Sequence, residues 1–115
     1  MQVGHGPPSV RSDLFGGKGQ VLVWNLLQGK AAPPFTAVLS CELEEGGHVG
    51  RHVQQEFDEI VLGLTGYGEI RVDGKAQPFG PGAVAYLPLG STLEIVNEAA
   101  DKVLRYLIIK AGTAK

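Results

Sequence analysis

The sequence has little cysteine, no excess of positive charge and no long apolar run. Cys41 is the only cysteine, so no disulfide can form within the chain. No apolar run approaches the length of a membrane span, and no continuous apolar stretch follows the first methionine as it does in a secretory leader. Ten Lys and Arg residues, scattered along the chain, stand against 12 Asp and Glu residues. This balance argues against nucleic-acid and membrane partners, and the cytoplasm is the expected location.

Helical periodicity is also missing, whereas turn-forming residues are plentiful. The 115 residues include 17 glycines and 7 prolines, and no stretch longer than about a dozen residues repeats apolar side chains at a helical spacing. A chain of this length usually forms one domain, and it can bury a core without disulfides. The composition therefore predicts a single domain of many short strands joined by tight turns.

Alternation of apolar and polar residues indicates where the strands lie. In Phe35–Leu43 every odd-numbered position is apolar, as in a strand with one buried face, and Cys41 belongs to that face. Cys41 is therefore expected to be a small buried side chain rather than a nucleophile. Further strands are expected at 20–27, 59–65, 69–72, 83–87, 93–97 and 103–110, and Asp73-Gly74 predicts a two-residue hairpin turn.

These strands predict an all-β fold of about seven or eight strands in two packed antiparallel sheets, arranged as a sandwich or barrel. The expected domain covers residues 20–110. Residues 1–19 are rich in glycine and lack an apolar pattern, so we expect a flexible or peripherally docked arm that includes a solvated His5. Residues 111–115 are expected to form a C-terminal tail.

One stretch brings together side chains that can bind a ligand. Between Gly46 and Gly66 the chain contains His52, Gln54 and Glu59. His52 and Gln54 are two residues apart, so on a strand they point to the same face about 7 Å from each other, and Glu59 opens the next strand, where it can face them. An imidazole nitrogen, an amide oxygen and a carboxylate that converge inside a barrel form a set of ligands suited to a divalent metal ion.

The spacing of these residues resembles the first motif of the cupin family. That motif is a glycine, five residues, a histidine, one residue, a second histidine, three or four residues, a glutamate, six residues and a glycine, and here Gln54 replaces the second histidine. The second cupin motif is matched by Gly82, Pro88, Gly90 and Asn97, whereas Leu93 stands where the family has a histidine. The two motifs span under half of the chain, and the flanking strands are where a cupin would need them.

The resemblance implies a small single-domain cupin: a double-stranded β-helix or jelly-roll barrel of two antiparallel sheets, with a pocket between the sheets and assembly into homodimers. In the family, the two histidines and the glutamate of the first motif and the histidine of the second motif bind one metal ion. Carried over to this chain, the metal ligands are His52, Gln54 and Glu59, and Leu93 lies in the pocket without a donor atom. The implied cofactor is one weakly bound divalent ion, Mn, Fe or Zn.

Three side chains of this region have more than one interpretation. On a continuous strand His48 lies roughly 13 Å from His52, so only a bend at Gly50 would bring it to the metal, and otherwise it is a loop histidine at the pocket rim. Gln54 is either a metal ligand or a buried amide that satisfies backbone groups. Burying an ionised Glu59 without a metal or a cation is costly, so this residue belongs to a functional site or a polar network.

Two functions follow from these features. One is a metal-dependent enzyme with a depleted ligand shell that acts on a small organic molecule, and the resemblance to cupins implies a dioxygenase, isomerase, decarboxylase or cyclase. The other is a metal-free cupin that binds a sugar or a carboxylic acid without catalysis, which the apolar Leu93 favours. An interaction module is a third, less supported interpretation. A homodimer is expected because Ile60, Leu62 and Leu64 form an apolar stripe on the face opposite Glu59.

Overall fold

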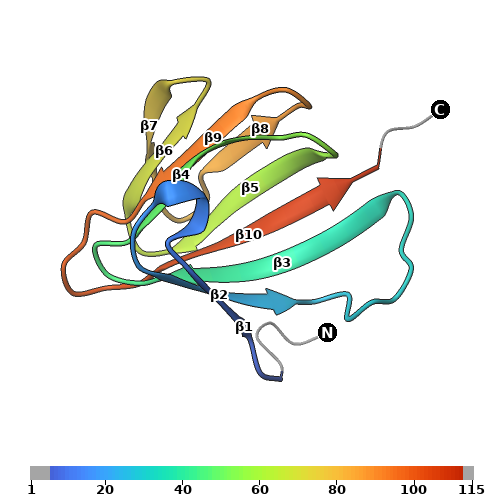
Figure 1. The fold of residues 1–115 in the computed structure, drawn as a ribbon, viewed down its shortest axis with the longest axis horizontal. Coiled ribbons are helices and arrows are strands. Elements are labelled where there is room, and N and C mark those ends of the chain that lie inside the picture. The colour runs from blue at the N-terminus through green and yellow to red at the C-terminus, as the bar shows by residue number, and fades with distance from the viewer. Residues whose placement is uncertain (1–5, 113–115) are drawn as a thin grey trace.

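The protein is an all-β structure, as predicted (Figure 1). It is a computed structural model that describes residues 6–112, so the expectations for His5 and for residues 113–115 lie outside the described part. The strands are β1 (Ser9–Ser12), β2 (Gln20–Asn25), β3 (Phe35–Leu43), β4 (His48–Val53), β5 (Asp58–Thr65), β6 (Gly68–Val72), β7 (Lys75–Phe79), β8 (Val84–Leu87), β9 (Thr92–Val96) and β10 (Leu104–Ala111), with a 3-10 turn, η1 (Leu14–Gly16), between β1 and β2.

The strands form two antiparallel sheets that pack face to face. One sheet has six strands in the order β1-β2-β3-β10-β5-β8, and the other has four in the order β4-β9-β6-β7. The predicted alternation of β3 is confirmed, because Cys41 is buried and pairs with the buried Tyr106 of β10. These side chains belong to one core cluster that also includes Leu93 and Ile95 of β9, in the smaller sheet. The core therefore lies between the two sheets.

The predicted hairpin is present between β6 and β7. Asp73 and Gly74 have φ angles of 51° and 80°, both positive, as the commonest two-residue turn between antiparallel strands requires. The strands on either side pair from Gly68↔Phe79 to Val72↔Lys75. The hairpin prediction is therefore confirmed.

The asparagine of the second motif has a structural role. Asn97 is 1% exposed, and its Nδ2 lies 2.8–3.2 Å from the backbone carbonyl oxygens of Leu43, Glu44 and Lys102. Its Oδ1 accepts a hydrogen bond from the Ala99 amide. One side chain thus links three segments of the chain, which is a structural role.

The N-terminal segment contributes to the barrel wall. Residues 9–12, expected in an arm, form β1 and pair with β2. All four side chains of β1 are exposed, so it lacks the buried alternating face that reveals a strand in the sequence. The turn η1 packs against β4 through bare backbones: a Cβ at Gly50 would overlap the Phe15 carbonyl oxygen, and one at Gly17 would overlap that of His48. Backbone contacts therefore fix this segment.

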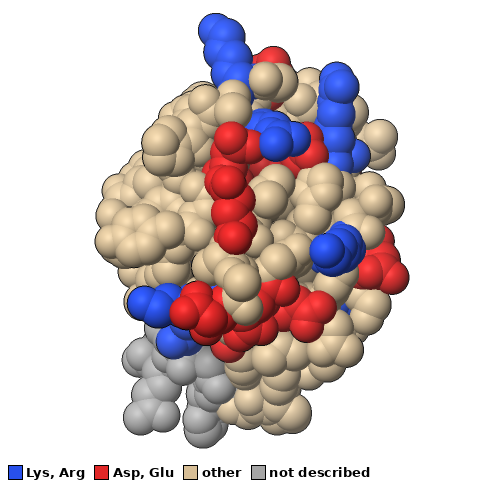
Figure 2. Space-filling view, turned by 90° about the vertical axis from the view of Figure 1, so that its left-hand side faces the viewer, with Lys and Arg blue, Asp and Glu red and all other residues tan. Residues whose placement is uncertain are grey.

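The surface has mixed charge on the face that Figure 2 shows, where acidic and basic side chains are interspersed and no broad basic area is seen. The net charge of the whole chain is −2. The described part of the chain contains no helix that is long and apolar enough to cross a membrane. The absence of a nucleic-acid partner stays a prediction.

Candidate ligand-binding site

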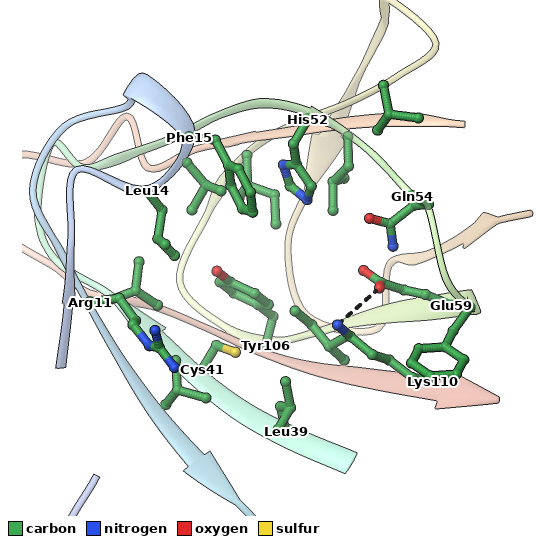
Figure 3. A pocket seen from close by; sticks show the side chains of 18 of the residues that line it. Arg11, Leu14, Phe15, Leu39, Cys41, His52, Gln54, Glu59, Tyr106 and Lys110 are labelled. Atoms are coloured by element: carbon green, nitrogen blue, oxygen red, sulfur yellow. Dashed lines mark ion pairs between the residues drawn. The ribbon is translucent and has the colours of Figure 1, made fainter. Parts of the chain in front are cut away.

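A cavity of about 480 Å³ lies between the two sheets (Figure 3). Its walls are mostly apolar and come from β2, β3, β9 and β10: Val21, Val23, Leu39, Leu93, Ile95 and Ile108. A volume of this size falls in the range of about 300–1,000 Å³ that is typical of small-molecule sites. The cavity is therefore large enough to hold a small organic molecule.

Four polar side chains gather at one end of the cavity, and we call them the inner cluster: His52, Gln54, Glu59 and Lys110 (Figure 3). His52 lies on β4, Gln54 directly follows that strand, and Glu59 and Lys110 are paired neighbours on β5 and β10. Lys110 Nζ is 3.9 Å from Glu59 Oε2. The structure thus brings together the three residues singled out in the sequence and adds an ammonium group beside the carboxylate.

His52 is held in a fixed orientation. Its Nδ1 is 3.0 Å from the Gly50 carbonyl oxygen, and its ring stacks on Phe15 of η1 with 3.9 Å between the ring centroids and 13° between the planes. Because a carbonyl oxygen can only accept, Nδ1 is the donor in this hydrogen bond. In the neutral imidazole Nε2 is then the acceptor nitrogen, and it is available to a ligand.

Glu59 is a buried carboxyl group, with 4% of its side chain exposed. Burial raises the pKa of Glu59 above the ordinary value of a glutamate, whereas Lys110, the Gln54 side chain and His52 oppose this increase. Burial has the largest effect of these. The carboxyl group therefore holds a proton more readily than an exposed glutamate, and it can donate or accept a hydrogen bond.

Two further side chains with acidic protons line the cavity. Burial raises the pKa of the Cys41 thiol to about 12, with a smaller increase from the charge of Glu59. Burial also raises the pKa of Tyr106 well above its usual value. Both groups therefore stay protonated at neutral pH, and the prediction that Cys41 is a buried side chain rather than a nucleophile agrees with its free, buried state.

His48 does not line the cavity, contrary to the expectation of a rim position. The pairing of β4 with β9 shifts register between Val49 and His52, so a bulge separates the two histidines. His48 lies within the strand, and its Nε2 forms a hydrogen-bonded pair with Glu94. Arg71 donates hydrogen bonds to Glu94 and Glu69 in the same group. We call these four residues the outer cluster: His48, Glu69, Arg71 and Glu94.

The inner cluster fits the metal ion of the cupin family poorly. Leu93 pairs with His52 across β4 and β9, so an aliphatic side chain stands where the family has its third histidine. The Lys110 ammonium group near Glu59 competes with a cation for the carboxylate. Among residues 6–112 no group of three or more His, Cys, Asp or Glu side chains has an arrangement that could hold a metal ion. What remains is one imidazole, one amide and one carboxyl group.

Several residues of the cavity were not predicted from the sequence. Arg11, Leu14 and Phe15 come from β1 and η1, which have no alternating pattern. Lys110, by contrast, has a signal in the sequence, because it is two and four residues from the inward-facing Ile108 and Tyr106 of the same strand. A lysine in phase with the apolar face of a strand indicates a buried partner of opposite charge.

Comparison with known proteins supports the family but not a particular activity. No protein-family model matches the chain, and no curated protein sequence matches it. A Thermotoga maritima structure, described as a predicted oxalate decarboxylase, has a TM-score of 0.88 and 26% identity and covers 97% of both chains. A cupin 2 conserved barrel domain protein from Salinispora arenicola has a TM-score of 0.76 and 24% identity over 98% of this chain and 87% of its own.

A third similar structure is a polyketide cyclase from Streptomyces resistomycificus, with a TM-score of 0.74 and 18% identity over 96% of this chain and 78% of the cyclase. The chain therefore has the fold of the cupin structures, and its two sequence motifs resemble those of that family. Relative to the cupin motifs, Gln54 and Leu93 stand at two of the three positions where that family has a metal-binding histidine.

Proposed function

We propose that the barrel cavity binds a small organic molecule without a resident metal ion, and that the inner cluster holds a polar group of this molecule. The observation that carries the proposal is the position of the Lys110 ammonium group, 3.9 Å from Glu59. A carboxylate that binds a metal ion needs space beside it for that ion, and here a positively charged side chain lies beside it. The apolar walls and the volume of the cavity support it.

The hydrogen-bonding groups of the inner cluster suit a hydroxyl or carbonyl group. Lys110 donates, His52 Nε2 accepts, and the Gln54 amide can do both. Glu59 accepts when ionised and donates when protonated. A sugar and a carboxylic acid both present the complementary groups. Two of the similar structures are described as a predicted oxalate decarboxylase and a polyketide cyclase, and both descriptions name small organic substrates, which supports this ligand class.

The proposal is tested by binding. A panel of neutral sugars and carboxylic acids is added to the full chain, and ligands are found by the shift of the thermal unfolding midpoint and measured by calorimetry. Ile108→Trp places a large ring in the cavity and should abolish binding. Ile109→Trp is the matched control on the opposite face of β10 and should leave binding unchanged. Loss of binding in both variants, or in neither, would contradict a site in the cavity.

The metal-dependent alternative gives a different result in the same assay. If binding appears only after incubation with Mn²⁺, Fe²⁺ or Zn²⁺ and disappears with a chelator, the chain needs a metal and the proposal of a metal-free site is wrong. Metal content after purification is measured by mass spectrometry on the same samples.

We also propose that a second copy of the chain covers the outer face of the larger sheet. Ile60, Val84 and Tyr86 lie on β5 and β8 and are 41%, 62% and 60% exposed. Ile60 and Tyr86 pair directly across the two strands. Large neighbouring apolar side chains on a sheet face are typical of a protein contact. Light scattering should give twice the monomer mass of 12.2 kDa, and Tyr86→Lys should shift the protein toward the monomer.

A further inference from the structure

A cation lies at the end of the cavity opposite the inner cluster. Figure 3 shows Arg11 across the cavity from Glu59 and Lys110, with Tyr106 and Leu39 between them. Arg11 is on β1, where it pairs with Val21 of β2, another residue of the cavity wall. Backbone pairing with β2 thus positions β1 so that the Arg11 guanidinium group faces the apolar cavity, although β1 itself is exposed.

Arg11 is free to bind an anion. Within residues 6–112, Arg11 takes part in no ion pair. The nearby carboxylate in sequence, Asp13, accepts a hydrogen bond from the Gly19 amide through Oδ1 and thereby closes the turn around η1. A guanidinium group has several donors in a planar fork that matches a carboxylate. The donors of Arg11 are therefore available to a ligand.

The other charged residues of the cavity lie at the inner-cluster end. Lys110 is opposed by Glu59 at 3.9 Å. Glu56, which also lines the cavity, is in the loop between β4 and β5 and so lies between Gln54 and Glu59 along the chain. The positive charge at the inner end is thus compensated, whereas no carboxylate among residues 6–112 forms an ion pair with Arg11 at the other end.

We infer that the ligand is an organic acid with two polar ends, and that Arg11 selects it by binding its carboxylate. The inference rests on the proposed function. The carboxylate lies at Arg11, an apolar body lies between Val23, Leu39 and Ile108, and a hydroxyl or carbonyl group at the far end contacts the inner cluster. A sugar fits this arrangement less well, because it has no charged group for Arg11 and no apolar body for the walls.

The experiment compares an acid with its neutral amide. The probes are 4-hydroxyphenylacetate and 4-hydroxyphenylacetamide, which differ in charge but hardly in shape, and binding to the full chain is measured by calorimetry at low ionic strength. We expect the acid to bind about tenfold more tightly than the amide, because hydrogen bonds to a charged group are worth that order of affinity.

The variants locate the source of this preference. Arg11→Met should reduce the affinity for the acid about tenfold and leave the amide unchanged, which removes the preference. Arg11→Lys should keep part of the preference, because it retains the charge but not the fork. Arg51→Met is the matched control: Arg51 is an exposed arginine of β4 that does not line the cavity, so the preference should remain. Thermal unfolding shows whether each variant is folded.

Three results would overturn the inference. The first is equal affinity of the wild-type protein for acid and amide, and the second is a preference that survives in Arg11→Met. In either case the proposed function stands, provided that Ile108→Trp still abolishes binding. The third is that neither probe binds at concentrations where neutral sugars of the panel do, which would identify the ligand as uncharged. If no molecule of the panel binds in the cavity, the proposed function itself is wrong.

Discussion

The inner and outer clusters contain similar residues but differ in their surroundings. Each has one histidine, at least one carboxyl group and one basic side chain. In the outer cluster Glu94 is close to both His48 and Arg71, Glu69 accepts from Arg71, and the Arg71 side chain is 41% exposed. In the inner cluster Glu59 is 4% exposed, and its cation is 3.9 Å away, beyond direct hydrogen-bond distance.

The two clusters thus differ in solvation and in how fully their hydrogen-bonding groups are paired. The outer groups are paired with one another and in contact with water, so they lose little by remaining together and have little capacity for a ligand. The inner groups carry a desolvated carboxyl group and an imidazole with a free acceptor nitrogen. A ligand that provides the missing partners would be bound by them.

The largest expected effect is on metal binding. Leu93 of β9 pairs with His52 of β4, so Leu93→His adds an imidazole directly opposite His52. This variant should increase bound Zn²⁺ or Mn²⁺ from well below one ion per chain toward one. The content is measured by mass spectrometry after incubation with each ion and removal of the excess.

Two double variants assign the added metal to one of the clusters. Leu93→His/Glu59→Gln should lose the ion, because the amide is a weaker ligand than the carboxylate. Leu93→His/His48→Ala should keep it, because His48 belongs to the outer cluster. Negligible metal in Leu93→His would show that Lys110 excludes a cation even from a restored ligand set.

The same comparison shows how far the sequence determines the structure. Period-two alternation predicted the bounds of β3 correctly, and the Asp73-Gly74 pair identified a hairpin turn, because both depend on local side-chain and backbone preferences. The cavity position of His52, Gln54 and Glu59 also followed from local spacing. These features need only residues that are close in the chain.

Features that depend on distant contacts were not predicted. The bulge in β4 changes the face on which His48 lies, and it is visible only in the pairing with β9. Arg11 reaches the cavity because β1 pairs with β2, although its own sequence has no apolar alternation. Lys110 and Glu59 are 51 positions apart in numbering, and only the β5–β10 register makes them neighbours. These contacts depend on how the strands pair in the folded sheets, which local sequence patterns do not specify.

The next largest expected effect is on stability, and it compares the loss of Lys110 from the inner cluster with the loss of Arg71 from the outer cluster. Lys110→Met leaves the buried Glu59 without a cation and should lower the free energy of unfolding at pH 8 by about 1–2 kcal/mol. This is less than the cost of breaking a fully buried pair, because Lys110 is 34% exposed. Arg71→Met in the outer cluster should have a smaller effect, because water can replace the guanidinium group. Denaturant unfolding measures both, and equal losses would contradict the distinction between the clusters.

The smallest expected effect is the pH dependence of stability due to Glu59. The pKa of Glu59 is raised in the folded protein, mainly by burial. Between the ordinary pKa of a glutamate and this raised pKa, the folded state binds more protons than the unfolded state, so the free energy of unfolding falls as the pH rises through that interval.

Glu59→Gln has no proton to exchange and should remove this part of the pH dependence of the unfolding free energy. The difference in unfolding free energy between the wild-type protein and Glu59→Gln is measured from pH 4 to pH 8. It should shift in favour of the variant as the pH rises, and a shift in favour of the wild-type protein would mean that Lys110 and the other inner-cluster groups stabilise the ionised carboxylate more than burial destabilises it.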